Sequence, residues 1–211
     1  MRTDNQTVIL FVKVVAKTES QQRAKDALLA DVNGARTETG NFKMELYQVD
    51  NAENNFYLIE RWRNKNDLET HFKQPYTQGA FDLQRADLTE PIEMNYLEDL
   101  WPLTNDLKKE VHHSLTTLIV PFEVKLGCAE KFIALFKQFV PLVRKEKGNV
   151  EFHFHRVIGS DTRFVLYERW EKQEDLNAHN QQGTTGVLLE SVAPLLTKPV
   201  IDFVLFSRDI S

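Results

Sequence analysis

The alternation of apolar and polar residues divides the first half of the chain into strands and helices. A nearly continuous apolar run at 8–15, rich in β-branched residues, predicts a buried strand. Apolar residues at helical spacing from 19 onward predict an amphipathic helix, which Gly40 ends in the position where helices favour a residue that tolerates positive φ. Period-two alternation at 42–47 and a strand at 56–62 enclose a polar turn, which predicts a hairpin.

The remainder of this half predicts two further helical segments and a closing strand. A short helix carries Leu68 and His71 on one side, because residues three apart lie on the same side of a helix, and Pro75 ends it. Apolar residues at 80–88 predict another helix, and 91–97 predicts the last strand. The overall order is βαββαβ, which is the ferredoxin-like plan.

The second half repeats this order. Phe-Tyr-Leu-Ile-Glu-Arg-Trp at 56–62 returns without a gap as Phe-Val-Leu-Tyr-Glu-Arg-Trp at 164–170, and a histidine follows each strand at the same distance. Three pairs of residues are separated by the same 108 positions: Glu60 and Glu168, Trp62 and Trp170, His71 and His179. The elements predicted for the second copy lie at 115–122, 129–140, 150–157, 164–170, 187–196 and 199–206. Such self-similarity indicates a duplicated structural unit.

We therefore predict two domains, 1–105 and 106–211, with a linker at 100–111. A ferredoxin-like domain carries its helices on one face of an antiparallel sheet. The other face is apolar in both copies, at Tyr57, Ile59, Val165 and Tyr167. Large uncovered apolar faces mark interfaces. The predicted fold class is α+β, with two tandem ferredoxin-like (βαββαβ) domains that form an intramolecular dimeric α+β barrel, an internal pseudo-dimer.

Composition narrows the class of protein and its partners. Apolar residues make up 42% of the chain and charged residues 27%, which is typical of soluble globular proteins. The net charge of −5, with no basic block, predicts that nucleic acid is not a partner. The single cysteine, Cys128, excludes an internal disulfide. A polar N-terminus without a signal peptide, and no apolar run near the roughly 20 residues that cross a bilayer, predict a cytoplasmic protein that is not bound to membranes.

The repeated motifs resemble those of the antibiotic biosynthesis monooxygenase (ABM) family, which includes quinol monooxygenases and has a dimeric α+β barrel fold. The resemblance rests on a strand ending in Glu-x-Trp, a helix with Leu-x-x-His, and Gly-Asn before the hairpin, and it covers both halves. The family typically follows its histidine with Pro and an aromatic residue or histidine. Pro75-Tyr76 matches this pattern, whereas the second copy has Gly183-Thr184. We therefore expect the chemistry in the first copy.

Other branches of the fold supply alternatives. Haem-degrading enzymes carry an asparagine on the first strand, which both copies lack. An isomerase of a phosphorylated autoinducer sugar carries a histidine on the first helix, where this chain has Val32 and Val140. The alternatives that stay open are an isomerase or degrading enzyme for a small, phosphorylated autoinducer-like metabolite, and a non-catalytic module that binds a small molecule.

The resemblance implies a cofactor-independent monooxygenase that oxidises a quinol-like or polyketide-like aromatic substrate with O₂. No GxGxxG or Walker loop is present, so no tightly bound flavin or nicotinamide is expected. His71 suits a general base because its ordinary pKa lies near working pH. Glu60 orients this histidine or accepts a substrate hydrogen bond. Trp62 supplies an apolar wall, and Tyr47 and Tyr76 can donate to a substrate oxygen.

The corresponding set in the second copy is His179, Glu168, Trp170 and His155. His153, His155 and Glu151 share one face of a strand and could ligate a metal. The first copy has Lys43, Glu45 and Tyr47 at these positions, so no metal site is predicted. The expected partners are a small aromatic substrate and O₂, and the pseudo-dimer could associate further into a homodimer.

Overall fold

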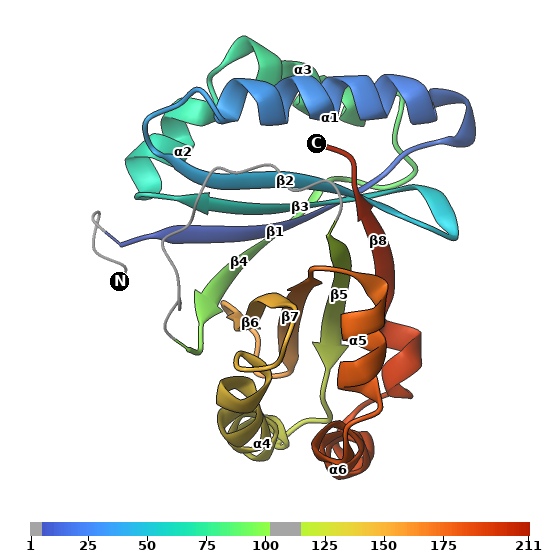
Figure 1. The fold of residues 1–211 in the computed structure, drawn as a ribbon. Helices are drawn as coiled ribbons and strands as arrows, with labels where there is room; N and C mark the ends of the chain where they lie inside the picture. Colours follow the sequence, from blue (N-terminus) through green and yellow to red (C-terminus); the bar gives the residue numbers. More distant parts are fainter. Residues whose placement is uncertain (1–5, 102–114) are drawn as a thin grey trace. The chain divides into compact units, whose positions relative to one another are not determined.

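The computed structural model describes residues 6–101 and 115–211 (Figure 1), so most of the predicted linker lies outside the described residues. The described residues form two compact units, one made of 6–97 with 208–211 and the other of 98–101 with 115–207. Within the described part of the chain, no helix has both the length and the apolar character needed to cross a membrane.

The first copy has the predicted order of elements. Its strands and helices are β1 (Val8–Val15), α1 (Gln21–Ala35), β2 (Asn41–Val49), β3 (Ala52–Trp62), α2 (Lys65–His71), α3 (Pro75–Asp82) and β4 (Glu93–Asp99). The strands pair antiparallel in the order β4-β1-β3-β2. The apolar face of the sheet packs on α1 through a cluster that includes Leu10, Leu58, Leu28 and Val32.

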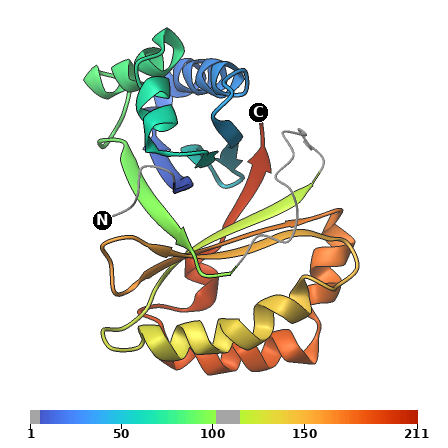
Figure 2. The same ribbon diagram turned by 90° about the vertical axis from the view of Figure 1, so that its left-hand side faces the viewer.

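The second copy repeats this plan. Its elements are β5 (Thr116–Glu123), α4 (Ala129–Val143), β6 (Asn149–Val157), β7 (Arg163–Trp170), α5 (Gln173–Asn180), α6 (Gly183–Val192) and β8 (Leu205–Asp209). The antiparallel order is β8-β5-β7-β6. Figures 1 and 2 show the helices of each copy on one face of that copy's own sheet. The predicted fold class, an α+β protein with tandem ferredoxin-like domains, is confirmed.

Several helix boundaries differ from the predictions, among them that of α6, which was expected at 187–196 and runs from Gly183 to Val192. The helix expected at 80–88 begins at Pro75 and ends at Asp82, with a 3₁₀ turn at Leu83–Arg85. Pro75 therefore starts α3, because the first position of a helix needs no backbone N–H. The first helix ends at Ala35 rather than at Gly40.

Gly40 and its counterpart Gly148 instead allow a helix to approach the chain closely. A Cβ on Gly40 would collide with the Asp67 side chain, and one on Gly148 would collide with Asp175. Gly148 also has a φ of 77°, a conformation that side chains disfavour. Each glycine carbonyl accepts a hydrogen bond from the backbone N–H that follows the Glu-x-Trp strand, at 2.8 Å in both copies. The repeated glycine thus sets the distance between the strand end and the histidine helix.

The last strands of the two copies differ, and here the prediction for the second copy was wrong. Leu10 pairs with Tyr96 in the first copy, and Leu118 pairs with Phe206 in the second. The two leucines are 108 residues apart, whereas their partners on the last strands are 110 apart. The region predicted as a strand at 199–206 contains a 3₁₀ helix, η4 (Val200–Phe203), before β8 begins at Leu205.

Pairing of β5 with β8 ends before Pro121. Proline has no N–H and cannot donate to a ladder. The equivalent residue of the first copy, Lys13, still pairs with Glu93 of β4. The last strand of the second copy, β8, is shorter than β4, and η4 precedes it.

We predict that Gly148→Ala destabilises the protein more than Gly40→Ala. Both changes force a Cβ into an aspartate side chain, an overpacking cost of about 1–3 kcal/mol, and at Gly148 the positive φ adds about 1–2 kcal/mol. Urea unfolding measures the change. Gly79→Ala is the control, because a Cβ there meets nothing within 4 Å in the interior of α3, and it is expected to stabilise by about 0.5–1 kcal/mol. Equal effects of all three substitutions would contradict this account.

Candidate functional site

Each copy holds a buried glutamate against a buried tryptophan on its central strand. The Trp62 indole N–H donates to Glu60 Oε2 at 2.9 Å, and the Trp170 indole N–H donates to Glu168 Oε2 at 2.8 Å. Residues two apart on a strand face the same way. The spacing of Glu-x-Trp therefore creates this bond, and both side chains lie on the face that the helices cover.

The histidine at the end of the following helix packs on the tryptophan. The His71 and Trp62 ring centroids are 4.4 Å apart, and those of His179 and Trp170 are 4.8 Å apart. Asn64 caps α2, since its side chain accepts the Asp67 N–H at 2.9 Å. The predicted grouping of histidine, glutamate and tryptophan is therefore present in both copies.

A second carboxylate, which sequence reasoning missed, holds each histidine. His71 Nδ1 lies 2.7 Å from Glu38 Oε1, and His179 Nδ1 lies 2.9 Å from Glu146 Oε2. Glu38 and Glu146 follow the first helix of each copy and are themselves 108 residues apart. The duplication therefore contained the signal that could have identified them.

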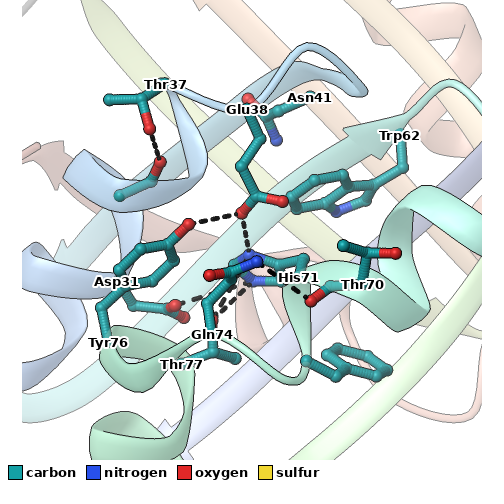
Figure 3. A network of polar contacts seen from close by, with 12 residues as sticks. Asp31, Thr37, Glu38, Asn41, Trp62, Thr70, His71, Gln74, Tyr76 and Thr77 are labelled. Atoms are coloured by element: carbon teal, nitrogen blue, oxygen red, sulfur yellow. Dashed lines mark hydrogen bonds and ion pairs between the residues drawn. The ribbon is translucent and has the colours of Figure 1, made fainter.

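In the first copy, polar groups enclose His71 further (Figure 3). Its Nε2 lies 3.6 Å from Asp31 Oδ1, and both of its ring nitrogens are 3.4 Å from the Thr77 hydroxyl. Tyr76 donates its hydroxyl to Glu38 Oε1 at 2.9 Å. The Tyr76 ring occupies the space that a Cβ on Gly34 would need. His71 thus has a carboxylate beside each of its two nitrogens.

The second copy replaces most of these groups. At the positions of Asp31, Gly34 and Tyr76 it has Phe139, Leu142 and Thr184. The Phe139 ring centroid is 5.8 Å from that of His179. Thr185 donates to the His179 backbone carbonyl at 2.8 Å rather than lying against the ring. Asp31, whose carboxylate faces His71 Nε2 in the first copy, therefore has the aromatic residue Phe139 as its counterpart in the second.

The cavities beside the two histidines differ in volume. The cavity at His71 and Glu60 measures about 30 Å³, and the cavity at His179 and Glu168 measures about 370 Å³. About 30 Å³ suits water-sized occupants, whereas ligand sites span roughly 300–1,000 Å³. The larger cavity therefore lies in the second copy, whereas we expected the chemistry in the first.

Packing explains this difference in volume. In the first copy, Phe72 and Phe81 meet edge to face with centroids 5.6 Å apart, and both line the small cavity. Their counterparts are the smaller Asn180 and Leu189. In the second copy, η4 precedes the short strand β8. Val200 and Ile201 of η4 form part of the wall of the larger cavity.

Trp62 and Trp170, which we expected to supply an apolar wall, line neither of these two cavities. Two further predicted site residues face the other side of the sheet. Tyr47 pairs with Tyr57 on the opposite face of the sheet and donates its hydroxyl to Glu45 at 2.6 Å. His155 pairs with Val165 on the corresponding face, with Nδ1 3.1 Å from Asp99 Oδ1. Each of these residues lies an odd number of positions along its strand from the residues that face the helices. Successive side chains on a strand point to opposite faces, so neither side chain reaches its cavity. Among the described residues, no cluster of three or more His, Cys, Asp or Glu side chains could hold a metal ion.

The comparison with known families agrees with these motifs. The family described as antibiotic biosynthesis monooxygenase matches residues 7–83 and 116–185, which is well over half of the chain and includes both copies of the site. The chain belongs to this family. A Bacillus subtilis relative named "Putative monooxygenase YcnE" is 22% identical over 87 residues, which cover 41% of this chain and 92% of the relative. One copy of the repeat therefore corresponds to nearly the whole of that protein.

Solved structures match both ABM copies together. A Fusobacterium nucleatum protein named as a putative monooxygenase has a TM-score of 0.77 at 12% identity, covering 97% of this chain and 95% of that one. A Lactobacillus acidophilus protein with the same description has a TM-score of 0.70 at 14% identity, covering 91% and 90%. At such low identity, this likeness shows the tandem fold alone.

Burial shifts the pKa values of the ionisable groups at both ABM sites. Burial raises the pKa of Glu60 to about 8 and that of Glu168 to about 7, although the tryptophan N–H bonds oppose the shift by favouring the charged carboxylate. Burial also raises the pKa of Asp31 and, together with the bond to Glu38, raises the pKa of Tyr76 to about 12. In the second copy, burial lowers the pKa of His179, and the bond to Glu146 opposes this change.

These shifts predict a pH-dependent stability. Glu60 and Glu168 hold their protons more tightly in the folded protein than in the unfolded chain. The free energy of unfolding therefore falls as pH rises from about 4.5 to about 8. Glu60→Gln keeps an acceptor for the Trp62 N–H and removes the charge. As pH rises across that range, the free energy of unfolding of this variant should fall less steeply than that of the parent, by up to about 1.4 kcal/mol per pH unit.

Denaturant unfolding at several pH values measures this effect, and Glu171→Gln on an exposed residue is the control. A parallel pH profile for the parent and Glu60→Gln would show that the buried carboxyl does not govern the trend.

Proposed function

We propose that this ABM protein is a cofactor-independent monooxygenase that uses O₂ to oxidise a quinol-like or polyketide-like aromatic substrate in the cavity of the second copy. One observation carries the proposal: a largely apolar cavity of about 370 Å³ has both a histidine and a carboxyl group in its wall. A flat, electron-rich ring needs apolar walls together with a few placed polar groups.

His179 is the proposed general base. The Glu146 carboxylate at 2.9 Å holds the proton on Nδ1 and leaves the Nε2 lone pair to accept a proton from the substrate. Phe139 stands at the position from which Asp31 faces His71 in the first copy. Since burial lowers the pKa of His179, the imidazole is neutral at neutral pH. A neutral, oriented imidazole is what proton abstraction from a phenolic hydroxyl requires.

Glu168 and Trp170 are the proposed positioning groups. The Trp170 N–H occupies Glu168 Oε2 at 2.8 Å, and the carboxyl group is also in the cavity wall. With a pKa of about 7, Glu168 can accept or donate a hydrogen bond to a substrate hydroxyl near neutral pH. Trp170 does not line the cavity, so its part is to hold the Glu168 carboxyl group in the orientation that meets the reacting oxygen.

The proposed reaction balances without an external reductant. Loss of a hydroxyl proton to His179 gives an electron-rich anion that can pass an electron to O₂. When a hydroquinone becomes a hydroxyquinone, the ring gains one oxygen atom and gives up four electrons in total, and the other oxygen atom leaves as water. The four electrons reduce O₂ completely, so the protein supplies proton transfer and orientation.

The residues that line the larger cavity favour an aromatic substrate over the phosphorylated sugar of the alternative function. Among the described residues that line the larger cavity, none is a lysine or arginine, and the ionisable carboxyl present is Glu168. Phosphate is held in proteins by such cations or by clustered N–H donors. An apolar wall rich in phenylalanine favours an uncharged aromatic ring instead.

We predict that His179→Ala and His71→Ala have unequal effects on activity. His179→Ala should lower kcat/KM for quinol-dependent oxygen consumption by roughly 10²–10⁴-fold, since general-base catalysis contributes about that much. His71→Ala should leave it within about twofold, because its cavity of about 30 Å³ cannot admit a ring. Oxygen-electrode assays with a panel of hydroquinones and anthrones measure both variants, with circular dichroism as a check on folding. Equal loss in both, or full activity of His179→Ala, would overturn the assignment of the second copy.

A second prediction concerns the pH dependence of the rate. Activity should fall on the acid side as His179 becomes protonated, with an apparent pKa below its ordinary value of about 6.5. The bond to Glu146 raises the pKa of His179, so Glu146→Gln should move this acid limb to lower pH. The variant should also reduce kcat, because the imidazole loses its orienting partner. Profiles of kcat/KM against pH test the shift, and an acid limb that moves to higher pH would contradict the proposed role of Glu146.

A further inference from the structure

The larger cavity opens onto an apolar rim. Eight large hydrophobic side chains are exposed among the described residues, and three of them also line this cavity: Leu189 at 40%, Ile201 at 64% and Phe206 at 45%. They belong to three different elements, α6, η4 and β8. Exposed apolar side chains that converge on one opening are a recurring sign of a surface that something covers.

The ionisable groups of the cavity are buried, unlike the residues of the rim. Glu168 and His179 are buried, and the glutamate is held by the buried Trp170. The cavity therefore has its ionisable groups in the buried part and a mainly apolar rim, in which Asn180 is an exposed polar residue. A ligand that matches both parts has a polar, ionisable head and an apolar part that reaches the surface.

The rim depends on the insertion that distinguishes the second copy. Ile201 belongs to η4, which the two extra residues before β8 create, and β8 then places Phe206 beside it in the lining. In the first copy, β4 continues through the equivalent region and pairs with β1 as far as Lys13, with Ile92 and Met94 in the wall of the small cavity. The same local change thus enlarges the cavity and supplies its exposed apolar edge.

We propose that the substrate is an amphiphile: an oxidisable aromatic ring that carries an aliphatic chain. The ring lies in the cavity with a hydroxyl at Glu168 and His179, and the chain leaves along Leu189, Ile201 and Phe206. The oxidation of the ring rests on the proposed function, whereas binding of the chain does not require turnover. Each methylene that leaves water for an apolar surface contributes about 0.8 kcal/mol, or roughly a fourfold change in Kd.

The test uses 2-hydroxy-1,4-naphthoquinones with linear alkyl chains of zero to six carbons at the 3-position. These oxidised compounds bind without being consumed, so quenching of tryptophan fluorescence reports Kd on the full chain. For the parent protein, Kd should fall roughly fourfold per added carbon over the first few carbons. Ile201→Ser should reduce this dependence on chain length markedly. Ile158→Ser is the matched control, because Ile158 is similarly exposed at 42% and does not line the cavity, and it should retain the parental dependence.

Several outcomes would overturn the inference. One is a Kd that does not change with chain length, and another is an Ile201→Ser variant with the parental dependence. If light scattering shows a homodimer that Ile201→Ser disrupts while the dependence on chain length is unaffected, the rim is an interface between copies of this chain. Oxygen consumption with the corresponding quinols is measured separately. Chain-dependent binding without oxygen consumption would refute the oxygenase and retain the amphiphile as the ligand.

Discussion

The structure of each copy depends on a buried contact in which a strand glutamate accepts a tryptophan N–H and a helix histidine packs on the same indole ring. This contact joins the central strand to the helical layer at one place. A buried carboxyl group is costly unless it is hydrogen-bonded or protonated, and the indole N–H supplies one of the bonds it needs. The second carboxylate, Glu38 or Glu146, then holds the outer nitrogen of the histidine. The scaffold therefore requires a glycine where the histidine helix approaches the chain, and both copies have one.

The two copies keep this contact and differ in what surrounds it. In the first, Asp31, Tyr76 and Thr77 enclose the histidine, and the Phe72–Phe81 pair fills the space beside it. In the second, smaller or apolar residues stand at the positions of Asp31, Phe72 and Tyr76, and a cavity remains. The same hydrogen-bonded framework thus surrounds a small cavity in one domain and a larger cavity in the other. His71 lies in the packed domain, and we propose the role of proton acceptor for its counterpart His179.

Burial gives the second site its chemical character. It lowers the pKa of His179 and raises that of Glu168 to about 7, so both groups can exchange protons close to neutrality. The largely apolar lining also strengthens the interaction of these groups with a bound hydroxyl, because the local dielectric constant is lower than that of water. The proposed oxidation needs a base beside a cavity that can hold an aromatic ring, and His179 is the residue that we propose as this base.

The sequence by itself determined the duplication, the order of elements and the pairing of Glu60 with Trp62, because the 108-residue offset and the period of two along a strand are local properties of the chain. It also led to the family through short motifs that both halves share. Tertiary structure alone decided which copy is hollow, since that depends on how Phe72, Phe81 and η4 pack against residues distant in the chain. It also showed that Tyr47 and His155 face away from the histidines, although their residue types suited the chemistry. A cavity is the space left by many side chains together, so no motif in a single stretch of sequence records its volume.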